Sequence, residues 1–259
     1  MMKHRYLALA GLVAASLVTG CEKDGVQQIT VPAPASRIRF FNFAPGAPTV
    51  NFYANDQKMT AIVSATGAES TNGVAYTGVG SGGNYNGIAA GTYTLTGKIS
   101  TTTDKDVAIS PVQTTIAEGK WYSYYMSGFY NTTSKTAEAF VVEDNLPAID
   151  YTKAYVRFVN AISNSSPMVL TAKEQATTLS TPIGAAVAYK GAGSFVAITP
   201  GLYDISARAS GASADAFPAR TSVSFSAGRI YSISARGDIT LATNTTATNR
   251  PFLDNTANY

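Results

Sequence analysis

The chain has 259 residues, of which 45% are apolar and 14% charged, and its formal net charge is +3. This composition excludes an intrinsically disordered chain, because apolar residues are frequent enough to build a core. The sequence contains a single cysteine, Cys21, and a single histidine, His4. Sites built from several cysteines or histidines are therefore excluded.

The first twenty residues have the layout of a secretory signal peptide. A basic start with Lys3 and Arg5 precedes an uncharged run at residues 6–18, which is shorter than the roughly 20 residues that span a bilayer. Small residues then lead to Cys21. This order resembles the lipobox of bacterial lipoproteins, which implies cleavage before Cys21 and lipidation of its thiol. We therefore predict a signal peptide at 1–20 and a lipidated tether at 21–36.

The tether begins with the charged run Glu-Lys-Asp at residues 22–24. This run is similar to the export signal that sends some lipoproteins of the Bacteroidota to the outer face of the outer membrane. A merely solvated tether is the alternative. We expect a protein that is lipid-anchored in the outer membrane, and the face of that membrane stays open.

Cleavage before Cys21 removes chemistry as well as charge. It leaves 17 basic and 16 acidic residues, no histidine, and one cysteine that would carry lipid. Ser-His-Asp, Cys-His and His-zinc sites then lack their residues. Without a cluster of lysines and arginines, we expect no nucleic-acid partner. We predict no enzymatic activity, no catalytic residue, no cofactor and no metal.

The rest of the chain repeats itself in order. Four repeated pairs of segments are 39–42 and 157–160, 76–80 and 189–193, 91–95 and 201–205, and 119–123 and 228–232. Because the pairs keep their order and nearly the same spacing, the sequence indicates a tandem duplication.

Each copy carries the signals of short β-strands. Apolar and polar residues alternate at 37–40, 49–53, 92–96 and 121–127, as in half-buried strands, and glycine, proline and asparagine turns separate them. We predict an all-β fold of two tandem sandwich domains, at residues 37–148 and 153–255.

Several segments together resemble a known family. They are 39–42, 45–48, 90–93 and 119–122 in the first copy, and 157–161, 200–203 and 227–231 in the second. They are similar to the domain-of-unknown-function 4397 family of secreted or lipid-anchored bacterial domains. The resemblance covers most of residues 37–255 and departs at Glu118, Ile162 and Pro200. It implies an immunoglobulin- or transthyretin-like sandwich and transfers no catalytic residue.

One glycine-rich segment and two pairs of acids carry possible chemistry. Residues 78–83 satisfy the pattern G-x-G-x-x-G, but turn formers follow where a dinucleotide site needs a helix, so we predict a flexible loop. Glu143 and Asp144 are neighbours on a predicted strand and point to opposite faces. Asp104 and Asp106 are predicted in a solvated loop. A calcium site or a weak carboxylate-dependent hydrolase is the alternative for these acids.

Aromatic residues give the main candidate for a binding site. Trp121 and Tyr125 share one face of a predicted strand, opposite the core face, and could stack on a sugar or anchor a protein. Packing against the other copy or a loop is the alternative. Tyr93 and Tyr203 are expected to be structural. Arg39 and Arg157 are expected to be solvated or paired across strands.

These observations lead to one functional expectation and two alternatives. We expect a cell-envelope lipoprotein that acts as a non-catalytic surface binding or adhesion module, with a glycan or a surface protein as partner. A carbohydrate-processing accessory protein or weak hydrolase is one alternative, and a structural spacer of the envelope is the other.

Overall fold

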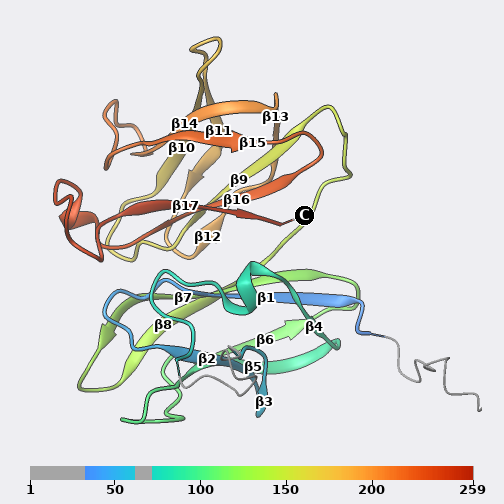
Figure 1. Ribbon diagram of the computed structural model, residues 1–259, viewed down its shortest axis with the longest axis vertical. Coiled ribbons are helices and arrows are strands. Elements are labelled where there is room, and N and C mark those ends of the chain that lie inside the picture. The colour runs from blue at the N-terminus through green and yellow to red at the C-terminus, as the bar shows by residue number, and fades with distance from the viewer. Residues whose placement is uncertain (1–32, 62–71, 259) are drawn as a thin grey trace, which may run out of the picture. The chain divides into compact units, whose positions relative to one another are not determined.

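The computed structural model describes residues 33–61 and 72–258 (Figure 1). The predicted signal peptide at 1–20, the lipidation site Cys21 and the tether up to residue 32 lie outside the described residues. Within the described part, no helix is long and apolar enough to cross a membrane.

The fold is all-β, as the alternation of apolar and polar residues predicts. Two short 3₁₀ helices, η1 (Gly80–Gly83) and η2 (Ile239–Leu241), accompany the strands. The strands up to residue 143, here called the first half, are β1 (Ser36–Asn42), β2 (Val50–Ala54), β3 (Gln57–Lys58), β4 (Asn86–Ile88), β5 (Gly91–Ile99), β6 (Val112–Ile116), β7 (Trp121–Asn131) and β8 (Thr136–Glu143). Those from residue 154 onward, the second half, are β9 (Ala154–Asn160), β10 (Met168–Glu174), β11 (Ser180–Val187), β12 (Gly191–Ala192), β13 (Val196–Ile198), β14 (Gly201–Ala209), β15 (Arg220–Phe225), β16 (Ile230–Arg236) and β17 (Phe252–Ala257).

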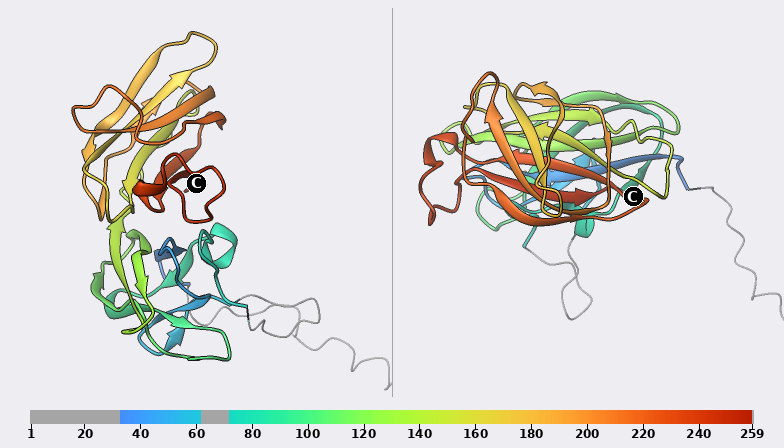
Figure 2. Two further views of the ribbon diagram at one scale, coloured as in Figure 1. Left: turned by 90° about the vertical axis from the view of Figure 1, so that its left-hand side faces the viewer. Right: turned by 90° about the horizontal axis from the view of Figure 1, so that it is seen from above.

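The strands form four sheets, two in each half (Figures 1 and 2). The orders in the first half are β4-β1-β7-β8 and β3-β2-β5-β6. Those in the second half are β12-β9-β16-β17, where β13 also pairs with β9, and β11-β10-β14-β15. The opening strand of each half pairs in parallel, β1 with β7 and β9 with β16. The other strand pairs are antiparallel.

The first half has its core between its two sheets. Phe40 of β1 stacks on Phe52 of β2 with ring centroids 5.2 Å apart, and Tyr124 of β7 packs against both at 5.7 and 5.5 Å. All three side chains are buried. Tyr122, Tyr124 and Met126, which alternate along β7 with Trp121 and Tyr125, all belong to this cluster, so the core face of this strand is the one opposite Trp121, as predicted.

The second half has a separate core of the same kind. Phe225 of β15 lies 5.5 Å from Tyr203 of β14 and 5.1 Å from Tyr231 of β16, measured between ring centroids. Ile233 and Ala235, which follow Tyr231 at every second position of β16, belong to this core as well. Each half therefore buries its own set of apolar side chains.

Matched tyrosines fasten matched turns in the two halves. The hydroxyl of Tyr93 donates to the carbonyl oxygen of Ala89 at 3.1 Å, and that of Tyr203 donates to Thr199 at 2.7 Å. The structural role predicted for these two tyrosines is confirmed, since each hydroxyl holds the backbone four residues earlier.

The glycine-rich segment at 78–83 precedes a strand. It contains η1, where Ser81 and Gly82 have φ angles of 53° and 64°, and β4 begins soon after it. The segment therefore lacks the long helix that would present its N-terminus to a pyrophosphate.

A third apolar cluster joins the halves. It combines residues of β1, β7, β8 and the turn after β1 with residues of β9 and the turn after it, and its buried members are Phe41, Phe43, Tyr125, Phe140, Val159 and Ala161. The sheet that contains β1 and β7 is thus covered on both faces, by its own core and by the second half. We call this contact between the halves the joint.

The joint overturns the expectation that Arg39 and Arg157 are solvated, while the alternative of cross-strand pairing holds for Arg157, which donates to its register partner Ser232 on β16. Both were predicted to be solvated or cross-strand paired, on the outward face of an opening strand. They are only 0% and 2% exposed, because the outward faces of β1 and β9 meet each other. The alternation located these side chains on the correct face, but it could not show that this face is covered.

Candidate functional site

Trp121, the single tryptophan of the chain, lies at the rim of the joint. It begins β7 directly after a turn in which Gly119 has a φ of +70°, a conformation that favours glycine. Its ring is half-buried and meets the ring of Tyr85 edge-on, with centroids 4.7 Å apart and planes at 70°. One part of the indole is therefore fixed by packing while another part reaches the surface.

Tyr125 lies on the same strand but inside the joint. Its ring is sandwiched between Phe41, at 4.4 Å, and Phe140, at 5.0 Å, and it is 0% exposed. The expectation that Tyr125 offers its ring to a ligand is wrong. The alternative, packing against the other copy, holds for this residue because its hydroxyl also reaches Ser234 of the second half at 3.4 Å.

A hollow of about 310 Å³ opens beside Trp121. It is lined by residues of the turn before β7 and of the segment that leaves β8, namely Gly119, Lys120, Trp121, Asp144, Asn145 and Leu146. We call it the Trp121 hollow. An aromatic face with an amide, a backbone turn and a charged rim is a combination that suits a polar ligand with one flat apolar side.

The rim of the Trp121 hollow carries an ion pair. Lys120 Nζ lies 3.0 Å from Glu143 Oε1, and both side chains are well exposed. The hydrogen bond and the charge of Glu143 raise the pKa of Lys120. Glu143 and Asp144 point to opposite sides as predicted, since Glu143 is paired at the surface while Asp144 is buried.

Asp144 forms the floor of the hollow and is fully engaged by protein groups. Its Oδ2 accepts hydrogen bonds from Tyr85 Oη and Ser123 Oγ, both at 2.7 Å. Its Oδ1 pairs with Nη2 of Arg157 from the second half. Its backbone N–H donates to the carbonyl oxygen of Trp121 at 2.6 Å. A carboxylate with these partners is a structural anion.

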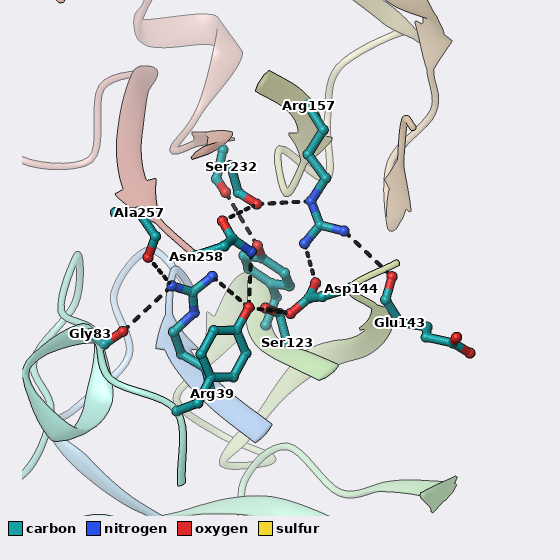
Figure 3. A network of polar contacts seen from close by, with 12 residues as sticks. Arg39, Gly83, Ser123, Glu143, Asp144, Arg157, Ser232, Ala257 and Asn258 are labelled. Carbon is teal, nitrogen blue, oxygen red and sulfur yellow. Dashed lines mark hydrogen bonds and ion pairs between the residues drawn. The ribbon is translucent and has the colours of Figure 1, made fainter. Parts of the chain in front are cut away.

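Of the two buried arginines, Arg157 pairs with this carboxylate directly, while Arg39 is linked to it only through the hydroxyl of Tyr85 (Figure 3). Arg157 Nε donates to Ser232 Oγ at 2.8 Å, and its guanidinium lies 4.7 Å from the centre of the Phe195 ring. Arg39 donates from Nη1 to the carbonyl oxygen of Ala257 at 2.8 Å and from Nη2 to Tyr85 Oη at 3.2 Å.

Tyr85 and Asn258 close the network. Asn258 Nδ2 donates to Tyr85 Oη at 2.9 Å, while Asn258 Oδ1 accepts from Ser232 Oγ at 2.9 Å. Burial first, and then the charge of Asp144, raise the pKa of Tyr85 well above its ordinary value. We call this group the seam, and its members are Arg39, Tyr85, Ser123, Asp144, Arg157, Ser232 and Asn258.

We call residues 144–153, which lead from β8 to β9, the connecting segment. A second hollow, of about 290 Å³, is lined in part by this segment and in part by the second half. Its lining shares Glu143, Asn145 and Arg157 with the surroundings described above, and the full set is Val142, Glu143, Asn145, Pro147, Arg157, Ala192, Gly193, Ser194 and Phe195. Residues 142–147 therefore contribute to the lining of both hollows.

The second pair of acids considered for calcium, Asp104 and Asp106, lies apart from these hollows. Asp104 and Asp106 lie in the turn after β5 with φ angles of 58° and 64°, and Lys135 forms an ion pair with Asp104. Within residues 33–61 and 72–258, no group of three or more His, Cys, Asp or Glu side chains could hold a metal ion.

Sequence reasoning found Trp121 but missed the seam. The available signal was an arginine at the same place in both repeats, Arg39 and Arg157, in strands whose other residues are strongly apolar. A charge kept within such a strand often has a buried partner. Tyr85 carried no comparable signal, because it follows a glycine-rich segment that resembles a loop.

Comparison with known proteins gives a family match. A family model described as "Domain of unknown function (DUF4397)" matches residues 36–171, which extends from β1 through the joint into β10. No curated protein matches the chain.

Proposed function

The chain belongs to the DUF4397 family, and we propose that it is a lipid-anchored, non-catalytic binding or adhesion module of the bacterial outer membrane. In this proposal two tandem immunoglobulin-like sandwiches follow a signal peptide, and the Trp121 hollow takes a saccharide. The partly exposed indole that lines that hollow is the observation that carries the binding role.

The tandem arrangement is supported by both sequence and topology. The two halves share their strand order and a parallel pair between the first strand and a late strand. Asn42 Nδ2 and Asn160 Nδ2 also donate to equivalent carbonyl oxygens, those of Val74 at 3.0 Å and Val187 at 3.2 Å. A shared ancestral unit explains why these details occur twice.

The membrane anchor is supported by the order of the N-terminal segments. A basic start, a short apolar run and small residues precede Cys21. Lipidation at Cys21 would add about 0.8 kcal/mol of membrane affinity for each buried methylene, so that several acyl chains on one residue give durable anchoring. The similarity of residues 22–24 to an export signal of the Bacteroidota supports the outer membrane.

A binding role fits the acids better than a hydrolytic one. Glycoside hydrolysis needs two carboxyl groups free to act on one bond, about 5–9.5 Å apart. Asp144 accepts from two hydroxyls and pairs with Arg157, while Glu143 pairs with Lys120 on the other side of the strand. The acids beside Trp121 are thus engaged in holding the structure.

Saccharide binding is favoured by the chemistry of the hollow. The C–H faces of a sugar ring stack on an indole, and its hydroxyls bond to amide and charged groups such as Asn145, Lys120 and Glu143. Asn145 and Lys120 line the hollow with Trp121, and Glu143 pairs with Lys120. A surface protein that inserts a polar loop is the competing ligand class.

The test is a glycan array probed with residues 22–259 and with the Trp121→Ala variant. We expect selective binding that falls at least tenfold in the variant, since a central aromatic anchor contributes about 1–3 kcal/mol or more. Tyr151→Ala is the matched control, because Tyr151 is a 78% exposed aromatic residue that does not line the hollow. Binding that survives Trp121→Ala, or no glycan bound at all, would contradict the proposal.

A further inference from the structure

We propose that Arg157 is a positioning residue for the Trp121 hollow, so that the second half completes a binding surface built from the first. This inference rests on the proposed function of that hollow and adds the requirement for the joint. No atom of Arg157 lines the Trp121 hollow, so its effect is transmitted through the residues that do.

Two separate segments form the wall of the hollow. One side is Trp121 with the turn at Gly119 and Lys120, and the other side is the connecting segment at Asp144, Asn145 and Leu146. The hollow therefore has its shape only while the connecting segment stays where it is.

Asp144 holds the connecting segment in place. The N–H of Asp144 donates to Trp121 at 2.6 Å, and the N–H of Leu146 donates to the carbonyl oxygen of Asp144 at 2.8 Å. Asn145 is exposed, and Leu146 is only half-buried. The buried contacts of this segment are concentrated on the carboxylate of Asp144.

Arg157 binds the chain at two points where it leaves β8. Its Nη2 pairs with Asp144 Oδ1, and its Nη1 donates to the carbonyl oxygen of Glu143 at 3.4 Å. Its Nε is fixed by Ser232, and its guanidinium packs on Phe195. The planar fork of an arginine can satisfy these partners together, whereas the ammonium of a lysine cannot.

The single tryptophan provides a direct measurement that needs no ligand. Trp121 alone reports indole fluorescence, and its accessibility to acrylamide reports whether the wall of the hollow is in place. The relevant equilibrium is between the wall in place and the wall displaced, and loss of a residue that transmits coupling shifts an equilibrium of this kind by roughly 2- to 30-fold. We therefore expect the acrylamide quenching constant to rise at least about twofold in Arg157→Met.

The matched control removes another arginine of the joint. Arg236 pairs with Asp254 and lies over the rings of Phe43 and Tyr76 of the first half, at 6.0 and 5.5 Å. It touches neither Asp144 nor residues 145–146 in the structure described. Arg236→Met should therefore leave the quenching of Trp121 unchanged, although it also removes an ion pair.

The variant Arg157→Lys keeps the test decisive if Arg157→Met does not fold. We expect it to increase quenching less than Arg157→Met does but more than Arg236→Lys, with circular dichroism confirming that each protein is folded. Unchanged quenching in folded Arg157→Lys, or an equal change in Arg236→Lys, would overturn the proposal. A glycan array without any bound saccharide would contradict only the proposed ligand, because the quenching result does not depend on it.

Discussion

Arg157 of β9 and Asp144 at the start of the connecting segment form an ion pair that is nearly inaccessible to water, with side chains 2% and 0% exposed. The hydroxyls of Tyr85 and Ser123 donate to the carboxylate of Asp144, and the hydroxyl of Ser232 accepts from the guanidinium of Arg157. The pair thus joins two separately cored halves. A buried pair of this kind adds little net stability over well-packed apolar residues, because the cost of desolvation offsets the attraction between the charges.

We predict that Asp144→Ala is strongly destabilising. The substitution leaves the guanidinium of Arg157 buried without its carboxylate, a situation that costs about 3–5 kcal/mol. The free energy of unfolding, measured by urea denaturation of the full chain, should fall by that amount. A loss below about 1 kcal/mol, the range of surface pairs, would show that water replaces the carboxylate.

The neighbouring residue supplies the control for that experiment. Glu143→Gln removes the pair with Lys120, in which the side chains are 36% and 51% exposed. Because exposed pairs contribute about 0–1 kcal/mol, we expect little change in unfolding free energy. The difference between adjacent acids would then reflect burial alone.

The two seam arginines should differ in sensitivity to substitution. The described partners of Arg39 are carbonyl and hydroxyl oxygens, so Arg39→Met leaves no buried carboxylate alone. Replacing a buried charge by an apolar side chain is often nearly neutral in such a case, within about 1–2 kcal/mol. Arg157→Met leaves Asp144 alone and should cost about 3–5 kcal/mol. Equal losses in the two urea titrations would refute the distinction.

The strands and the two cores could be predicted because their information is local. Alternation at 121–127 places Tyr122, Tyr124 and Met126 in a core, and the structure agrees. The same alternation gave the correct side for Tyr125 and Arg39. It could not tell whether the far face of a sheet meets water or another sheet, because that depends on contacts between residues more than one hundred positions apart.

The candidate site was predictable only in part for the same reason. Trp121 stands out as an aromatic residue on the face opposite the core. Its hollow, however, is shaped by the pairing of Asp144 with Arg157, which links a segment end to a separate sheet. Adjacent acids such as Glu143 and Asp144 look alike in sequence, and only burial distinguishes a rim residue from a member of the seam.

The lipid anchor gives a prediction that does not depend on the folded halves. In a bacterial host, the wild-type protein should enter the detergent phase of a Triton X-114 extraction, while Cys21→Ser should stay in the aqueous phase, because serine carries no thiol to lipidate. Mass spectrometry should show a wild-type N-terminus at residue 21 that carries acyl chains. An intact Met1 with a free thiol would refute lipidation.

Buried tyrosines predict a loss of stability at alkaline pH. Burial raises the pKa of Tyr85, Tyr124 and Tyr125, and raises that of Tyr189 to about 12. Tyrosines of the unfolded chain release their protons near pH 10. The folded state therefore binds more protons above that pH, and its stability, fully present below about pH 10, declines by about 1.4 kcal/mol per pH unit for each buried group. Urea titrations between neutral and alkaline pH measure this slope.

Tyr125→Phe isolates one proton of that slope. The hydroxyl of Tyr125 makes only a long contact of 3.4 Å with Ser234, so the substitution keeps the stacked ring and removes little besides the titrating group. We expect nearly wild-type stability at neutral pH and a shallower decline above pH 10, by about one proton. Tyr151→Phe, at a 78% exposed position, is the matched control for the loss of a tyrosine hydroxyl outside the joint. Equal slopes in wild type and Tyr125→Phe would mean that the joint opens before the halves unfold, which exposes Tyr125 while the protein is still largely native.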